Sequence, residues 1–282
     1  MTERPERDGD RGKERPVSDP SDRILRAHLR EMPFHRVIMR SIEARILSDV
    51  ALPRPVLDVG CGDGHFGSVI FPGGADVGLD PGVADLAEAR SRGVYRLRVG
   101  ADSGDMPFPD ASFKSVVSNC VFEHIPEIDR TIAEIARVLE PGGVFACTVI
   151  GEHFSELLTD ARAWRRLGLG GMHRAYLDWF NRKSVHFHFD SPEVWRKRFE
   201  AVGLAVERWR YYVSPQAAKA FHRAHYVSLP HLVAKRLTGR WVPFPALTDN
   251  AFWLGRYRRW VDEPAPQTGS CIAFVCTRRG GR

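Results

Sequence analysis

The residues of this sequence best placed to do chemistry form a glycine-rich turn directly after an apolar strand. Residues 56–67 read VLDVGCGDGHFG, and the predicted strand Pro55–Val59 leads straight into Gly60, Gly62 and Gly64. Glycine allows a tight turn and lets the backbone approach a ligand closely, and the helix that follows offers unpaired N–H groups at its start. The run that begins at Gly62 also has the GxGxxG spacing of dinucleotide-binding proteins. The segment therefore predicts a ligand-binding turn, with a plain tight turn as the alternative.

A carboxylate stands where a nucleotide ribose would need one. Asp80 follows the second predicted strand, Asp76–Leu79, at about the 20-residue separation expected of a ribose-binding acid. Such a carboxylate can accept two hydrogen bonds from ribose hydroxyls. The turn and the acid together predict an adenosine-containing ligand, and they fit NAD and S-adenosylmethionine equally well.

Two further segments belong to the same region. Residues 101–126 read ADSGDMPFPDASFKSVVSNCVFEHIP, in which an acidic loop leads to an apolar strand, Ser115–Cys120, with Asn119 at its end. Residues 134–149 read EIARVLEPGGVFACTV, in which a helix ends, the chain turns, and a fifth strand, Val144–Ile150, begins. Both segments place polar or turn residues at strand ends.

Strands and helices alternate through the first half of the chain, which predicts a doubly wound parallel α/β sheet. Before the first strand, apolar residues recur at helical spacing from Phe34 to Ile46. The remaining predicted elements are helices at 64–70, 83–90, 129–139 and 192–202 and strands at 96–99, 204–212 and 271–276.

Taken together, these four segments resemble the class I S-adenosylmethionine-dependent methyltransferases. The similarity is greatest to the small-molecule group that includes the ubiquinone and menaquinone biosynthesis enzymes (methyltransferase type 11). It covers residues 55–150 well and 191–212 more loosely. The resemblance implies a Rossmann-like, doubly wound, seven-stranded, mostly parallel sheet with an antiparallel last strand and a helical cap. It also implies S-adenosylmethionine as cofactor, because an NAD-dependent reductase is not expected to carry the EHIP and LEPGG segments.

The resemblance further implies roles for individual residues. Asp58 and the glycine turn would hold the methionine part of the cofactor, Asp80 the ribose, and Asp102 the adenine amino group, with Asp105 as a rival for that last role. A sulfonium cation suits the acidic set Asp58, Asp63 and Asp80, whereas a pyrophosphate needs N–H donors. The implied cofactor-binding residues are Asp58, Gly60, Gly62, Gly64, Asp80, Asp102, Ser103, Met106 and Asn119, with Asn119 beside the sulfonium.

Histidines supply the candidates for a general base. Methyl transfer is an in-line displacement that mainly requires alignment and exclusion of water, and an oxygen acceptor also benefits from a base. His124 follows the fourth strand, on the edge where ligands bind open α/β sheets, and is the predicted catalytic residue. A purely structural role for His124 in its loop is the alternative, and His153, His186 and His188 are further candidates.

Two long inserts, 151–190 and 213–265, follow the fifth and sixth strands. Both strands end at the ligand-binding edge, so we expect the inserts to form a lid or substrate cap over the active site. Their mixture of aromatic and cationic residues suits a sugar or polycyclic acceptor, an anionic membrane surface, or a small aromatic core within the cap.

The predicted divisions of the chain are a disordered tail at 1–20, N-terminal helices and the cofactor-binding core at 21–150, the cap insert at 151–190, a core helix and strand at 191–212, the second cap insert at 213–265 and the final core strand at 266–282.

The composition limits the classes of protein to which this chain can belong. The net charge of +6 is a mild excess that does not by itself indicate nucleic-acid binding. No apolar run is long enough for a transmembrane helix, and the charged N-terminus does not resemble a secretory signal. The five cysteines lack metal-binding spacing, so we expect buried free thiols and no metal. A cytoplasmic location is expected, with surface attachment to a membrane as an option.

The favoured function is O-methylation of a small-molecule acceptor such as a sugar, a polyketide or another natural product. A lipid or membrane-bound acceptor is the first alternative. Nucleic-acid methylation is the second, although the segment Asn119–Phe122 lacks the Asn-Pro-Pro-Tyr-like motif typical of amino-methylating enzymes. A non-catalytic cofactor-binding protein is the last, and the intact glycine turn and Asp80 argue against it.

Overall fold

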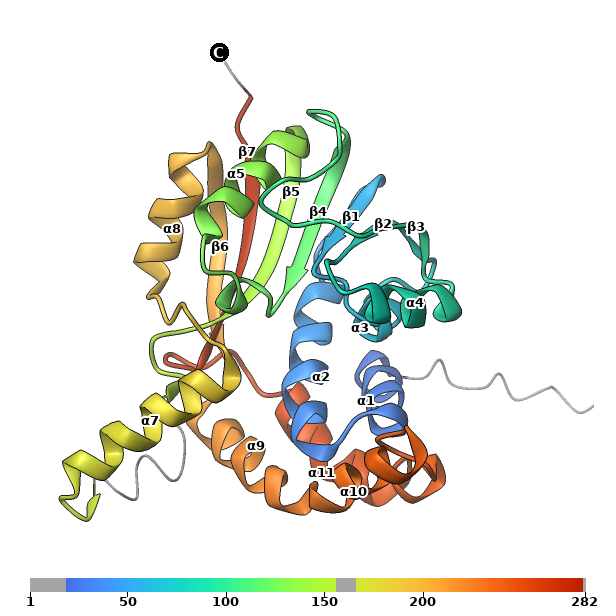
Figure 1. Cartoon of the computed structure of the whole chain (residues 1–282), viewed down its shortest axis with the longest axis vertical. Coiled ribbons are helices and arrows are strands. Elements are labelled where there is room, and N and C mark those ends of the chain that lie inside the picture. Colours follow the sequence, from blue (N-terminus) through green and yellow to red (C-terminus); the bar gives the residue numbers. More distant parts are fainter. Residues whose placement is uncertain (1–18, 156–165, 281–282) are drawn as a thin grey trace, which may run out of the picture.

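A single sheet organises the computed structural model, which describes residues 19–155 and 166–280 (Figure 1). Its seven strands lie in the order β3-β2-β1-β4-β5-β7-β6. Only β7 runs antiparallel to its neighbours, β5 and β6. The strands are β1 (Val56–Val59), β2 (Ala75–Leu79), β3 (Tyr95–Val99), β4 (Phe113–Asn119), β5 (Leu139–Ile150), β6 (Leu204–Tyr212) and β7 (Cys271–Arg278). The predicted fold class, a Rossmann-like mostly parallel sheet with an antiparallel last strand, is confirmed.

Several helices begin where the sequence offers a cap. The Asp19 carboxylate accepts from the Ser21 N–H, and Ser214 and Asn250 cap later helices in the same way. The helices are α1 (Pro20–Glu31), α2 (Phe34–Ser48), α3 (His65–Ile70), α4 (Val83–Arg92), α5 (Ile128–Val138), α7 (Gly170–Ser184), α8 (Pro192–Ala201), α9 (Pro215–Val227), α10 (Leu229–Thr238) and α11 (Ala251–Val261), with short 3₁₀ turns η1 (Phe122–His124) and η3 (Pro245–Leu247).

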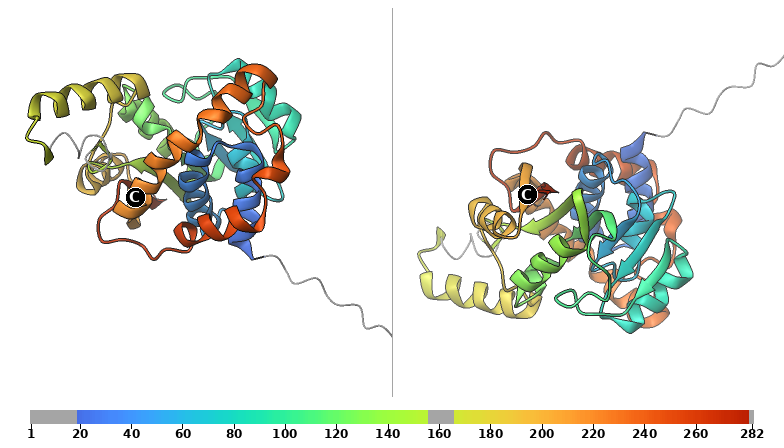
Figure 2. Two further views of the ribbon diagram at one scale, coloured as in Figure 1. Left: turned by 90° about the horizontal axis from the view of Figure 1, so that it is seen from below. Right: turned by 90° about the horizontal axis from the view of Figure 1, so that it is seen from above.

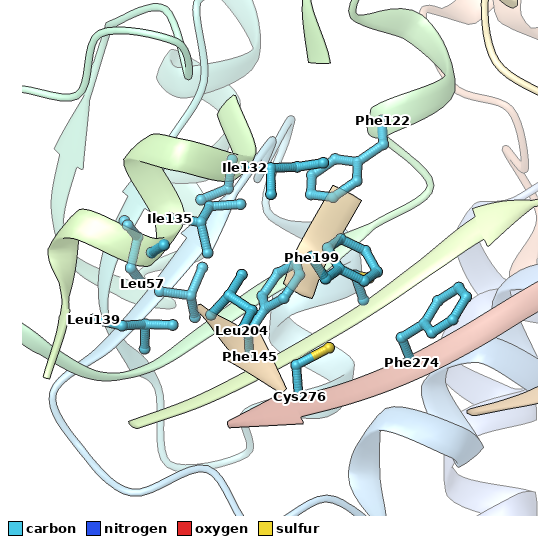
Figure 3. Close-up of a cluster of buried hydrophobic side chains, with 14 of the residues drawn as sticks. Leu57, Phe122, Ile132, Ile135, Leu139, Phe145, Phe199, Leu204, Phe274 and Cys276 are labelled. Carbon is cyan, nitrogen blue, oxygen red and sulfur yellow. The ribbon is translucent and has the colours of Figure 1, made fainter. Parts of the chain in front are cut away.

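The main core lies between the sheet and helices α5 and α8 (Figure 3). Phe199 of α8 packs edge-on to Phe145 of β5 and to Phe274 of β7, with ring centroids 5.7 and 5.3 Å apart. Aromatic pairs in this geometry stabilise a core beyond the area that they bury. Residues of α2, α3 and α4 form a second buried cluster with strands β1 to β5. The sheet is therefore covered on both faces, as a parallel sheet requires.

Helices from both ends of the chain gather beyond the carboxyl edge of the sheet. Figures 1 and 2 show α1 and α2 beside α9, α10 and α11 at this end of the molecule. A third apolar cluster joins α1, α2, α9 and α11, and the Thr248 hydroxyl donates to the Leu29 carbonyl at 2.6 Å. In contrast, α7 extends away from the body of the protein (Figure 1). The helices of the second insert therefore lie beyond the carboxyl edge of the sheet.

Within the sheet and the helices between its strands up to β5, the differences from the predicted elements are small, whereas the helices inside the two inserts had no predicted bounds. β5 begins at Leu139, because Leu139 pairs with Phe113 before the glycine turn at 142–143. The predicted tail lies outside the described residues except for its last two, and Pro20 already begins α1. All five cysteines are buried and free, as predicted. Within 19–155 and 166–280, no helix combines the length and apolar character needed to cross a bilayer.

Candidate functional site

The glycine-rich turn and Asp80 are joined directly by hydrogen bonds. The Gly62 N–H donates to Asp80 Oδ2 at 2.9 Å, and the Gly82 N–H donates to Oδ1 at 2.8 Å. Gly60, Gly62 and Gly64 all have positive φ angles, between 51° and 77°, which only glycine adopts at little cost. The turn follows β1, and the strand order reverses between β1 and β4, where ligands bind open α/β sheets.

Asp58 lies beneath this turn and is buried. Its Oδ2 accepts a hydrogen bond from the Tyr95 hydroxyl at 2.5 Å. Burial raises the pKa of Asp58 to about 6; the Tyr95 hydrogen bond lowers this pKa and the Asp80 charge raises it further. The Tyr95 ring also fills the space beside Gly64 and Gly78. Tyr95 therefore supports the turn from β3, a role that the sequence prediction missed.

Two glycines of the turn make a matched pair for substitution. A Cβ on Gly60 would overlap the side chain of Val121, whereas a Cβ on Gly62 would meet nothing within 4 Å. Both positions have positive φ, so each alanine costs about 1 kcal/mol of backbone strain. We expect Gly60→Ala to lower the free energy of unfolding by a further 1–3 kcal/mol, roughly the cost of overpacking. Urea unfolding of both variants tests this, and equal losses would contradict the geometry.

The loop after β3 carries the residues predicted to face the adenine. Asp102 and Asp105 are both exposed, and Asp102 Oδ1 accepts from the Gly104 N–H. Ser103 Oγ lies 2.9 Å from Thr131 Oγ1 of α5. Met106 is buried in the main core, and its N–H donates to Glu134. The structure thus leaves Asp102 and Asp105 open to solvent at the same edge as Asp80, and it uses Ser103 and Met106 to hold the loop on α5.

Asn119 at the end of β4 belongs to a buried polar network. Its Nδ2 donates to Glu43 Oε2 at 3.0 Å, and its Oδ1 accepts from the Thr148 hydroxyl at 2.8 Å. Glu43, on α2, is fully buried. Its other donors are Arg40, Cys120 and Tyr212, at 2.6, 3.1 and 3.2 Å. The network ties α2 to the carboxyl ends of β4 and β6, and of its members the sequence identified only Asn119.

Glu123 is a second buried carboxylate next to this network. It is 2% exposed, and Oε2 has no hydrogen-bond partner among the described residues. Burial raises the pKa of Glu123 to about 7; a backbone hydrogen bond and Arg40 oppose this shift, and Glu43 adds to it. A carboxyl group with this pKa can exchange a proton near neutral pH.

The raised pKa of Glu123 predicts how stability depends on pH. The folded state holds this proton up to about pH 7, whereas the unfolded chain releases it near 4.5. The stability of the wild type should therefore fall as pH rises between these values, and Glu123→Gln removes the effect. We expect the variant to gain up to about 3 kcal/mol over the wild type at pH 8 and little at pH 4.5. Denaturant unfolding against pH measures this, with exposed Glu127→Gln as control. A difference that does not change with pH would contradict the prediction.

His124, the predicted base, is exposed on η1. Its Nδ1 lies 3.0 Å from the Val185 carbonyl oxygen, and its ring centroid lies 5.0 Å from that of His186. His188 Nε2 lies 2.9 Å from the Ile125 carbonyl oxygen. Burial, followed by the charge of His124, lowers the pKa of His186 to about 4. The structure therefore brings three of the four candidate histidines together. The contact of His124 with the Val185 carbonyl uses Nδ1 and leaves Nε2 for another partner.

A cavity of about 410 Å³ borders the glycine turn on its outer side. Asp63 and His65 of the turn form one wall, and Arg36 of α2 and Trp241 form another. The Arg36 guanidinium lies 5.7 Å from the Trp241 ring centroid. Within the described ranges, no group of three or more His, Cys, Asp or Glu side chains is arranged to hold a metal ion.

Comparison with known proteins adds a family to this geometry. A family profile described as "Methyltransferase domain" matches residues 57–147. The chain is 32% identical over 114 residues to demethylmenaquinone methyltransferase of Symbiobacterium thermophilum, covering 36% of this chain and 45% of that protein. It is 36% identical over 124 residues to malonyl-[acyl-carrier protein] O-methyltransferase of Methylococcus capsulatus, covering 40% and 42%. The aligned region spans less than half the length of these curated relatives.

Solved structures share the fold over a larger part of the chain. A geranyl diphosphate C-methyltransferase from Streptomyces coelicolor matches with a TM-score of 0.53 at 14% identity, over 84% of this chain and 76% of that one. A SAM-dependent methyltransferase from Thermotoga maritima matches with a TM-score of 0.52 at 15% identity, over 87% and 91%. At these identities the matches show the fold alone. The family profile identifies residues 57–147 as a methyltransferase domain, and the sheet order is that of the class I, Rossmann-like fold.

Proposed function

We propose that the chain is an S-adenosylmethionine-dependent methyltransferase that methylates an oxygen atom of a small-molecule acceptor. The observation that carries this proposal is the direct link between the glycine turn and Asp80, at the point where the strand order reverses. Cofactors and substrates bind open α/β sheets in that crevice.

The residues present fit this cofactor. A Cβ at Gly62 would meet only open space, so a ligand has room beside the turn. The carboxylates of Asp58 and Asp80 make the crevice acidic, which suits a ligand with a sulfonium and an ammonium group. Asp80 would hold the ribose, and the turn with Asp58 would hold the methionine part. Bound there, S-adenosylmethionine supplies an electrophilic methyl group.

The adenine and sulfonium ends would be held by neighbouring strands. Asp102 follows β3 and is open to solvent, so its carboxylate is available to the adenine amino group, with Ser103 and Met106 fixing the loop. Asn119 is the last residue of β4, and Glu43 and Thr148 fix its side chain. These residues come from strands on both sides of β1, so one extended ligand could contact all of them.

The acceptor would enter under the helices of the second insert, which we propose act as a substrate cap. α9 and α11 pack on α2 and α1, beyond the carboxyl edge of the sheet. Such a cap excludes water and aligns the acceptor oxygen with the methyl carbon, and alignment supplies most of the rate of an in-line displacement. A sugar, polyketide or other natural-product alcohol fits this proposal, and one relative is itself named an O-methyltransferase.

His124 is the proposed general base. The Nδ1 contact with the Val185 carbonyl favours the tautomer in which Nε2 can accept a proton from the acceptor hydroxyl. A base in this position should work best when its imidazole is neutral.

Incubation with methyl-labelled S-adenosylmethionine and metabolite fractions tests the proposed function. We expect label in a methyl ether or ester, loss of label with Asp80→Ala, and a lower rate without weaker cofactor binding with His124→Gln. Label in nucleic acid, or cofactor binding without transfer to any fraction, would contradict the proposal. An unchanged rate in His124→Gln would reject only the base.

A further inference from the structure

Helix α10 turns its apolar face outward. No residue of the helix is buried, and its inner face touches the protein through His231, whose ring lies edge-on to Phe34 at 4.8 Å. The large side chains on its outer face, 42–80% exposed, are Leu229, Leu232, Val233 and Leu237. We call these four residues the α10 face. A helix on the surface of a globular protein normally directs its apolar stripe toward the core, so this orientation indicates a partner outside the chain.

The chain on both sides of α10 continues the exposed apolar surface. Tyr226 and Val227 precede the helix and are 60% and 52% exposed, and Phe244 and Leu247 follow it at 68% and 69%. Single exposed apolar residues are common on soluble proteins, but a series of large ones in one short segment marks an interaction site. The helix lies at the end of the molecule farthest from the amino edge of the sheet (Figure 1).

Charge indicates what kind of partner this face accepts. The insert 213–265 holds eight Lys or Arg residues and three Asp or Glu residues. At a spacing of 100° per residue, Arg236 falls within the α10 face, whereas Lys235 falls outside it, on the flank where its Nζ lies 6.0 Å from the Trp241 ring centroid. In the part of the chain that the structure describes, no carboxylate lies within ion-pair distance of Lys235, Arg236 or Arg240. Like charges oppose contact with a second copy of the same face, whereas an anionic lipid surface satisfies both the apolar and the basic groups.

We propose that the α10 face docks on an anionic lipid surface, with the helix lying in the membrane plane. Its leucines would enter the acyl boundary while Arg236 and Arg240 contact headgroup phosphates. The cavity beside the glycine turn is also lined by Lys235 and Arg240, so docking would hold that cavity next to the membrane. The proposal concerns attachment and does not depend on methyl transfer.

Co-sedimentation of the full chain with vesicles tests this proposal. Vesicles of phosphatidylcholine with one quarter phosphatidylglycerol, at low salt, should bind the wild type, and pure phosphatidylcholine should bind it much less. Leu232→Gln/Leu237→Gln should weaken binding at least about tenfold, and Arg236→Gln should weaken it severalfold. Raising the salt to about 0.5 M should release the protein, because it screens the headgroup contacts.

Val83→Gln is the matched control, because Val83 and Leu237 are each 80% exposed and Val83 lies on α4. This variant should bind vesicles within about twofold of the wild type. Equal recovery of the wild type in the supernatant with and without vesicles would overturn the proposal. So would a loss of vesicle binding in Val83→Gln as large as that in Leu232→Gln/Leu237→Gln. It would also fail if light scattering without lipid showed a dimer that Leu232→Gln/Leu237→Gln dissolves, because a second copy would then be the occupant.

Discussion

Asp80→Ala should weaken binding of S-adenosylmethionine or S-adenosylhomocysteine by at least about 100-fold. The proposed role of Asp80 is to accept hydrogen bonds from both ribose hydroxyls, and a hydrogen bond to a charged group contributes about 1.5–3 kcal/mol. The variant also releases the N–H groups of Gly62 and Gly82, which Asp80 holds at 2.9 and 2.8 Å. Isothermal titration calorimetry measures the change in affinity.

Two further variants separate the ribose contacts from a general charge effect. Asp85→Ala removes the same charge from an exposed position near Asp80 and should change affinity by less than about threefold. Asp80→Asn keeps one acceptor oxygen and should lie between Asp80→Ala and the wild type. An affinity that is unchanged in Asp80→Ala, or lost equally in Asp85→Ala, would contradict the assigned role.

Glu43→Ala should lower the free energy of unfolding by about 3–5 kcal/mol. Glu43 is fully buried and accepts from Arg40 of its own helix, from Asn119 and Cys120 at the end of β4, and from Tyr212 at the end of β6. Removing Glu43 leaves the Arg40 charge, on a side chain that is 29% exposed, and the donors on Asn119, Cys120 and Tyr212 without their acceptor, and losing one partner of a largely buried ion pair has an effect of this size. Chemical denaturation with circular dichroism gives the value.

Glu43→Gln and Glu88→Ala are the controls for this effect. The glutamine keeps the shape and one acceptor oxygen, so it should cost less than the alanine. Glu88 is exposed on α4 and forms an ion pair with Arg92 at the surface, so Glu88→Ala should cost less than about 1 kcal/mol. A loss in Glu43→Ala no larger than that in Glu88→Ala would show that the network contributes little to stability.

The alternating half of the chain could be predicted because each element carries its own local pattern. Apolar strands end in glycines or acids, and helices repeat apolar residues at three- and four-residue spacing, so β1 to β5 and α3 to α5 were found within a few residues. α1 was not delimited, although Asp19-Pro20 is a cap followed by a proline in the first turn. The residues before Pro20 and those of α1 itself are both rich in charged side chains. No change in composition therefore marks where the tail ends and α1 begins.

The supporting residues of the site could not be predicted, because their partners are far away in the sequence. Tyr95 reaches Asp58 across 37 residues, and Tyr212 reaches Glu43 across 169. No local spacing distinguishes these tyrosines from ordinary core residues. Glu123 differs, because it lies in the same EHIP segment as His124. The sequence favours the histidine because imidazole is the usual general base, whereas burial, which raises the pKa of Glu123, arises only in the folded protein.

The outward orientation of the apolar face of α10 also could not be predicted from the sequence. The helix LPHLVAKRLT has an ordinary amphipathic pattern, and a pattern alone does not say which face turns inward. In the folded protein, the contact of His231 with Phe34 and the exposure of the leucines fix the orientation.

The central claim is that the crevice between the glycine turn and Asp80 holds S-adenosylmethionine. A crystal structure of the protein grown with S-adenosylhomocysteine tests it most directly. We predict that the ligand lies along Gly60–Gly64, with both ribose hydroxyls within hydrogen-bond distance of the Asp80 carboxylate. An empty crevice at saturating ligand, or a ligand bound elsewhere while the crevice accepts a nicotinamide dinucleotide, would contradict the account.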